Sequence, residues 1–132
     1  MIQAGLKGLQ EIVVGPRDLA SAVGNVGAEV LSTHRVVLLM ELASRKAIEP
    51  FLQTGQMIVG TRIVIRHVAA APLGARVRVE SMLKESYGRK HVFDVAAYDE
   101  VEKLAEGQNE LLIISVEAFL AKLKAKMNRL RS

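Results

Sequence analysis

Apolar residues recur at helical spacing between Ser32 and Leu52 and at alternate positions along most of the remaining chain. The helical stripe predicts one long, largely buried helix, since residues three and four apart share a helix face. Ser32 or Thr33 can supply the N-cap oxygen, and Pro50 should end or kink the helix. We expect Ser44, which lies on the stripe, to bond its hydroxyl to the backbone one turn earlier. The stripe consists of Val36, Val37, Met40, Ala43, Ala47 and Ile48.

Five further segments alternate between apolar and polar residues or are rich in β-branched residues, and turn signals separate them. This pattern predicts strands. We interpret 71–74 (Ala-Pro-Leu-Gly) as a turn with proline second and glycine fourth, and Gly88 as the centre of a hairpin turn. Gly107 predicts an irregularity in the last strand. The strands are expected at 9–14, 57–70, 75–85, 90–98 and 104–116, and an amphipathic helix at 119–131.

The element order is a strand, a helix and then four strands in successive hairpins, within a single domain spanning residues 1–132. This order predicts an α+β fold in which a five-stranded antiparallel sheet wraps a long central helix. Residues 17–31 fit neither pattern because Gly24 and Gly27 interrupt a helix, so we expect a mobile segment with one helical turn at 18–23. The sheet covers only one side of the helix, which favours a homodimer or a higher homo-oligomer.

The net charge of +4 is concentrated at the end of the chain. Residues 117–132 form a basic amphipathic helix segment with one acidic residue, Glu117, and the rest of the chain is neutral. The segment has no aromatic platform, so nucleic-acid or membrane-surface binding is the weaker hypothesis, and we expect neither partner. The longest apolar run, 36–40, is too short to span a membrane. The basic residues are Lys122, Lys124, Lys126, Arg129 and Arg131.

The absence of cysteine limits the chemistry available to the chain. It excludes disulfides, thiolate nucleophiles and cysteine-ligated zinc. The three histidines, His34, His67 and His91, are not spaced as metal ligands, so we expect no metal site. The composition, and a first segment without a long apolar stretch, favour a cytoplasmic protein. Catalysis would therefore depend on carboxylates, imidazoles and hydroxyls.

Glu41 is the first candidate, because it lies in the most apolar run of the chain. A buried carboxylate must be paired or shift its pKa, and such groups are often catalytic bases or nucleophiles. The alternative is an ion pair with Arg45, four residues later on the helix surface.

His67 and Thr33 are the next candidates. Alternation places His67 on the same strand face as Thr61, Ile63 and Ile65, so we expect it to point towards the helix that carries Glu41. The alternative for His67 is a satisfied core histidine, which is also the simplest interpretation of His91. For Thr33 the alternative to a substrate-binding hydroxyl is simple N-capping.

These residues, with Gly60 and the turn at 71–74, occur in the order and spacing of a known family. The chain resembles the hotdog-fold thioesterases of the fluoroacetyl-CoA thioesterase type over nearly its whole length. The resemblance implies a dimer that hydrolyses acyl-CoA, with pockets at the subunit interface and no cofactor beyond the CoA of the substrate. Thr33, Glu41 and His67 would be catalytic, and Gly60 would contact the substrate.

Two positions depart from the family pattern. Leu111 stands where the resemblance implies a pocket arginine, and Gly27 stands where it implies a gating phenylalanine. Both substitutions indicate a less polar and more open substrate pocket and leave the acyl group undetermined. A non-catalytic acyl-CoA binding protein on the same fold is the alternative function.

The spacing of Thr33 and Glu41 adds a geometric constraint. Eight residues separate them, which is about 12 Å along a continuous helix. Either the helix begins after Thr33 and the chain folds back, or a partner subunit supplies one of the two residues. We favour the partner subunit.

Overall fold

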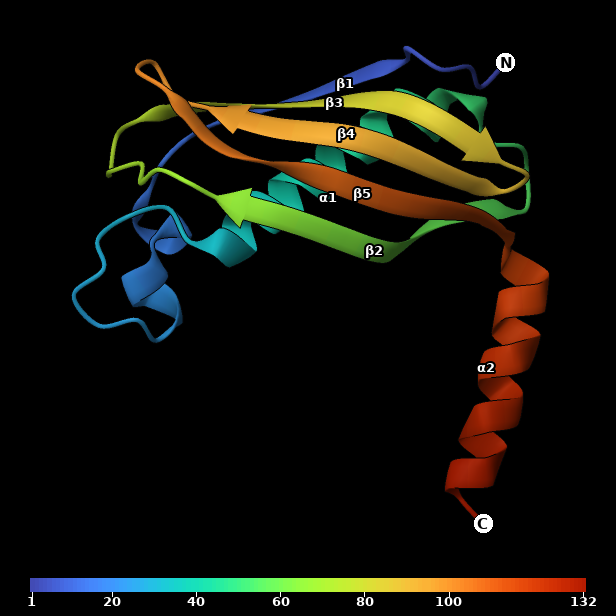
Figure 1. Cartoon of the computed structure of the whole chain (residues 1–132). Coiled ribbons are helices and arrows are strands. Elements are labelled where there is room, and N and C mark those ends of the chain that lie inside the picture. The colour runs from blue at the N-terminus through green and yellow to red at the C-terminus, as the bar shows by residue number, and fades with distance from the viewer.

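The computed structural model describes all 132 residues, and Figure 1 shows a curved sheet with one long helix, α1, against one face. The neighbouring strands are all antiparallel, in the order β1-β3-β4-β5-β2. The predicted α+β architecture is therefore confirmed. Only β3, β4 and β5 follow one another as hairpins: β2 pairs with β5, so the expected hairpin between β2 and β3 is wrong. The elements are β1 (Lys7–Val13), α1 (Thr33–Ile48), β2 (Gln56–His67), β3 (Arg76–Tyr87), β4 (Lys90–Tyr98), β5 (Lys103–Ser115) and α2 (Val116–Leu130).

The core lies between α1 and one face of the sheet, which we call the inner face. On β3, the inner residues Val77 and Val79 are buried while Arg76 and Arg78 are exposed on the outer face, as the alternation predicts. One buried hydrogen bond crosses the core, from Ser44 of α1 to Ser81 at 2.8 Å between the hydroxyl oxygens. The expectation that Ser44 bonds its own helix backbone is thus wrong, because a buried hydroxyl on the inner face is in reach.

The backbone of α1 lies directly against that of β1. A Cβ atom at Gly8 would lie 1.8 Å from the carbonyl oxygen of Ala43, so only glycine fits there. This contact sets the distance between α1 and the sheet at β1.

Two turn predictions need correction. The turn before β3 runs from Pro72 to Ala75, whose N–H bonds the Pro72 carbonyl. Gly74 is therefore third rather than fourth, where its φ of +89° suits a type II turn. At Gly107 the pairing is regular on both sides; the register shift between β2 and β5 lies between Gly60 and Arg62, opposite Leu111 and Glu110. Gly107 serves close approach instead, since a Cβ there would lie 1.9 Å from the Val64 carbonyl oxygen.

The helix boundaries also differ from expectation. α1 ends at Ile48 and passes into a short 3-10 helix, Glu49–Phe51, because Pro50 cannot continue the α-helical hydrogen bonding. α2 begins at Val116, earlier than expected, because Ser115 accepts a hydrogen bond from the N–H of Ala118 and caps it. The 17–31 segment contains two 3-10 helices, Pro16–Asp18 and Ala20–Val23.

α2 extends from the end of β5 away from the sheet (Figure 1). It has no buried residue, and its large apolar side chains after Val116 are at least 38% exposed. They are Phe119, Leu120, Leu123, Met127 and Leu130. None of the helices combines the length and the apolar character needed to cross a membrane.

The contact at Gly8 makes a direct prediction about stability. Gly8→Ala places a Cβ atom against the backbone of α1, so the free energy of unfolding should fall by at least about 2 kcal/mol. Denaturant unfolding measures this change. Lys7→Ala, an exposed neighbour on the same strand, is the control and should change stability by less than about 0.5 kcal/mol. Equal effects of the two substitutions would contradict the close approach of α1 and β1.

Candidate active site

Thr33 and His67 meet at the start of α1. The hydroxyl oxygen of Thr33 lies 2.9 Å from Nδ1 of His67, the last residue of β2. Ser32 performs the capping, because its hydroxyl oxygen accepts a hydrogen bond from the N–H of Arg35. The Thr33 hydroxyl is therefore not used as a cap and is available to the imidazole.

The environment of His67 favours its neutral form. Partial burial lowers the pKa of this imidazole, and a hydrogen bond to the Ala69 backbone opposes the shift only in part. Its Nε2 is buried and has no hydrogen-bond partner within the chain. A neutral ring with one nitrogen fixed by Thr33 and the other free can donate or accept a proton at Nε2, depending on its tautomer.

An ion pair with a largely buried carboxylate holds the segment that leads into α1. The Asp18 carboxylate lies 2.7 Å from Nε of Arg35 and accepts a hydrogen bond from the Gly15 N–H, and the Asp18 carbonyl accepts from the Ser32 N–H. The side chain of Asp18 is only 12% exposed. Sequence reasoning missed this pair, because the partners are distant along the chain and form no local pattern.

Glu41 lies farther along the same helix, above Gly60 of β2. A Cβ atom at Gly60 would lie 3.1 Å from Oε2 of Glu41, so the missing side chain makes room for the carboxylate. Glu41 is half-buried and forms no ion pair, which removes the alternative of a surface pair with Arg45.

The chain therefore presents two separate pairs, Thr33 with His67 and Glu41 with Gly60. Seven residues of extended strand, about 23 Å, separate Gly60 from His67. The expectation that His67 points towards the helix that carries Glu41 is confirmed, but His67 meets this helix at its first residue, Thr33, and not at Glu41. The helix is continuous from Thr33, so the alternative in which it begins later is excluded.

The model of a family described as fluoroacetyl-CoA-specific thioesterase, FlK, matches residues 14–117. The chain belongs to this family. The fluoroacetyl-CoA thioesterase of Streptantibioticus cattleyicolor is 38% identical over 98 residues, which are 74% of this chain and 70% of the relative.

Solved structures agree with the family assignment. A structure of the fluoroacetyl-CoA thioesterase FlK is 30% identical and has a TM-score of 0.88, covering 96% of this chain and 98% of its own. A hot-dog-like protein from Thermanaerovibrio acidaminovorans shares the fold at 20% identity, with a TM-score of 0.87 over 93% of this chain and 91% of that one. The predictions of a hotdog fold and of a thioester-hydrolysing enzyme are confirmed.

The two positions that depart from the family pattern lie in different surroundings. Leu111 is aligned with Gly60 in the sheet, but it is fully buried among the core residues under α1. It offers no surface to a substrate in the single chain. Gly27 lies in the exposed loop before α1 with a φ of +90° and nothing within 4 Å of a Cβ built there.

One groove crosses the outer face of the sheet and has a volume of about 1040 Å³. It contains none of the predicted site residues, and charged side chains of both signs line it. These are Lys7, Arg62, Arg66, Lys103, Glu80, Asp94 and Glu106. A second groove, of about 390 Å³, also contains none of Thr33, Glu41 and His67.

The lowered pKa of His67 predicts how stability depends on pH. The unfolded chain binds the proton more tightly than the folded one, so stability is lost as pH falls below 6.5, the ordinary value for this imidazole. His67→Gln should weaken this loss when melting temperatures are compared at pH 7 and pH 5. His34→Gln, which changes an exposed histidine, should leave the loss as in wild type. An unchanged pH dependence in His67→Gln would contradict the assignment.

Proposed function

We propose that this protein hydrolyses an acyl-CoA thioester at a site shared between two chains of a homodimer. The observation that carries the proposal is the separation of the two pairs, with Thr33 and His67 at the start of α1 and Glu41 over Gly60. Glu41 of one chain would act with Thr33 and His67 of the other.

Several surfaces of the single chain support a dimer or a higher homo-oligomer. β2 lies at an edge of the sheet, where one row of its backbone groups has no strand to pair with. On α1, Leu38 is 43% exposed, and the apolar side of α2 is uncovered. A second copy that covers these surfaces would also bring its own α1 close to this one.

A cytoplasmic location remains a prediction from the cysteine-free sequence.

The residues suit thioester hydrolysis without a cofactor. The Glu41 carboxylate removes a proton from water as the water oxygen attacks the thioester carbonyl carbon; the C–S bond then breaks and the CoA sulfur takes up a proton. Alternatively the carboxylate itself attacks the thioester carbonyl carbon, the C–S bond breaks and CoA leaves as the thiolate, which takes up a proton; water then hydrolyses the glutamyl anhydride to the free acid and the carboxylate. In either route, His67 can donate from Nε2 to the developing oxyanion when the Thr33 hydroxyl donates to Nδ1.

We further propose that the acyl group is less polar than fluoroacetyl. The curated relative is a fluoroacetyl-CoA thioesterase. This chain has Gly27, which has no side chain, in the exposed loop before α1, and Leu111, which is buried beside Gly60 and adds no polar group there. Thiol release from short, branched, aromatic and fluoroacetyl-CoA thioesters would rank the substrates.

Glu41→Ala should abolish thiol release, by more than about 100-fold, while the protein stays folded and keeps its oligomeric state. Glu49→Gln, which changes an exposed acidic residue just after α1, is the control and should keep wild-type turnover. Unchanged turnover in Glu41→Ala would refute the catalytic role. Tight acyl-CoA binding by wild type with no thiol released would instead indicate the non-catalytic binding protein.

A mixed dimer tests whether the site is shared. His67→Ala and Glu41→Ala homodimers should both be inactive. In a mixed dimer, Glu41 of the His67→Ala chain meets Thr33 and His67 of the Glu41→Ala chain, so one of the two sites keeps all its residues. Purified through two different affinity tags, it should regain about half of wild-type turnover. If all the catalytic residues acted within one chain, both sites of the mixed dimer would be defective and no activity would return.

A further inference from the structure

The residues of β2 that face α1 change from even-numbered to odd-numbered positions in the middle of the strand. Ile58 and Gly60, at even positions, face α1, and so do Ile63, Ile65 and His67, at odd positions. Side chains of a regular strand alternate, so residues seven apart, such as Gly60 and His67, would face opposite sides. The register shift between Gly60 and Arg62 inserts one extra residue, Thr61, and brings both onto the inner face.

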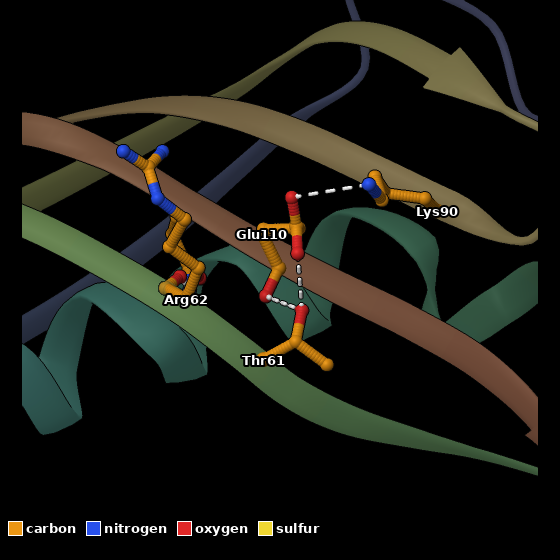
Figure 2. Close-up of polar contacts among 5 residues, drawn as sticks. Thr61, Arg62, Lys90 and Glu110 are labelled. Atoms are coloured by element: carbon orange, nitrogen blue, oxygen red, sulfur yellow. Dashed lines mark hydrogen bonds and ion pairs between the residues drawn. The ribbon is translucent and has the colours of Figure 1, made fainter.

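Polar contacts hold this bulge on the outer side of the sheet. The Thr61 hydroxyl donates to Oε2 of Glu110 at 2.7 Å, and its oxygen also lies 3.3 Å from the Glu110 carbonyl oxygen. Nζ of Lys90 lies 3.7 Å from the other carboxylate oxygen. Figure 2 shows Thr61 of β2, Glu110 of β5 and Lys90 of β4 in a row across three strands, with the Arg62 side chain directed away from them.

A second contact holds the bulge from the inner side. Nδ2 of Asn109 donates to the Arg62 carbonyl at 3.1 Å, and the Asn109 side chain is buried, with 1% of the residue exposed. Because the Arg62 carbonyl oxygen can only accept, the Asn109 side-chain amide is oriented with Nδ2 towards it. β5 thus holds Arg62, the residue after the insertion, as well as Thr61 itself.

We propose that Thr61 is a positioning residue of the reaction centre, acting through the bulge that places Gly60 under Glu41 and His67 beside Thr33. The proposal rests on the hydrolytic function proposed above. β2 is an edge strand, so β5 alone sets its register. A slip of one residue would turn one of the two pairs to the outer face. The Thr61 hydroxyl opposes this slip with a hydrogen bond to a charged acceptor, which is stronger than a neutral one.

Thr61→Val keeps the shape and the β-branching of the residue and removes only the hydroxyl. We expect kcat to fall about 10-fold or more, because small misplacements of reacting groups are costly, while KM stays within about two-fold. Thr61→Ser, which retains the hydroxyl, should restore kcat. Thr54→Val, at an exposed threonine just before β2, is the matched control and should behave as wild type. A purely structural role would lower the melting temperature and leave kcat of the folded protein unchanged.

A spectroscopic comparison tests the geometry without relying on activity. Glu41→Gln should move the amide NMR signal of Gly60 in the wild-type background, because the carboxylate lies against that backbone. The same substitution should move the Gly60 signal less in the Thr61→Val background. If Thr61→Val does not fold, Glu110→Ala removes the acceptor of the Thr61 hydroxyl and should give the same two results.

Full kcat together with an undiminished Gly60 response in Thr61→Val would overturn the positioning role. If wild type hydrolyses no acyl-CoA thioester, the proposed function fails, and the Gly60 response alone then decides whether Thr61 holds the bulge. A diminished response in that case would still support the bulge-holding role, and an undiminished one would refute it.

Discussion

At Gly8 the backbone of β1 lies against the backbone of α1, with no side chain between them. Together with the Ser44–Ser81 hydrogen bond, this contact fixes one flank of the helix on the inner face of the sheet. The opposite flank then faces β2, where Gly60 leaves space for Glu41. The position of each candidate side chain follows from how this one rigid helix is seated.

The sequence predicts the broad architecture, which the structure confirms, and it nominates the candidate residues. Helical spacing located α1, alternation located the buried face of β3, and Pro50 marked the end of the helix. A glycine inside a strand favours close approach or a bulge, and Gly60 shows both. These features are local, so a pattern of a few residues specifies them.

The pairing of the candidates could not be predicted, because it depends on register. Alternation carried unbroken through Thr61 places that residue inside with His67, whereas the extra residue in β2 turns Thr61 towards Glu110. The partners of Ser44 and Asp18 were missed for a similar reason, since Ser81 and Arg35 lie in other elements. Only the assembled sheet reveals which residues meet.

The electrostatic arrangement is simple. His67 is held by Thr33 and kept neutral by burial, and Glu41 is a carboxylate with no cationic partner in its own chain. Within one chain, the Glu41 carboxylate lies apart from Thr33 and His67, so it does not meet the donors that can stabilise an oxyanion. The geometry of a single chain therefore supports a reaction centre that a second copy completes.

A crystal structure with a non-hydrolysable acyl-CoA analogue tests this account most directly. The account predicts that the Glu41 carboxylate of one protomer lies within about 6 Å of Thr33 and His67 of the other, the span of two hydrogen bonds through one water or the thioester group. The analogue's carbonyl should lie between them. A structure in which the two pairs stay more than about 10 Å apart in every combination of protomers would contradict the shared site.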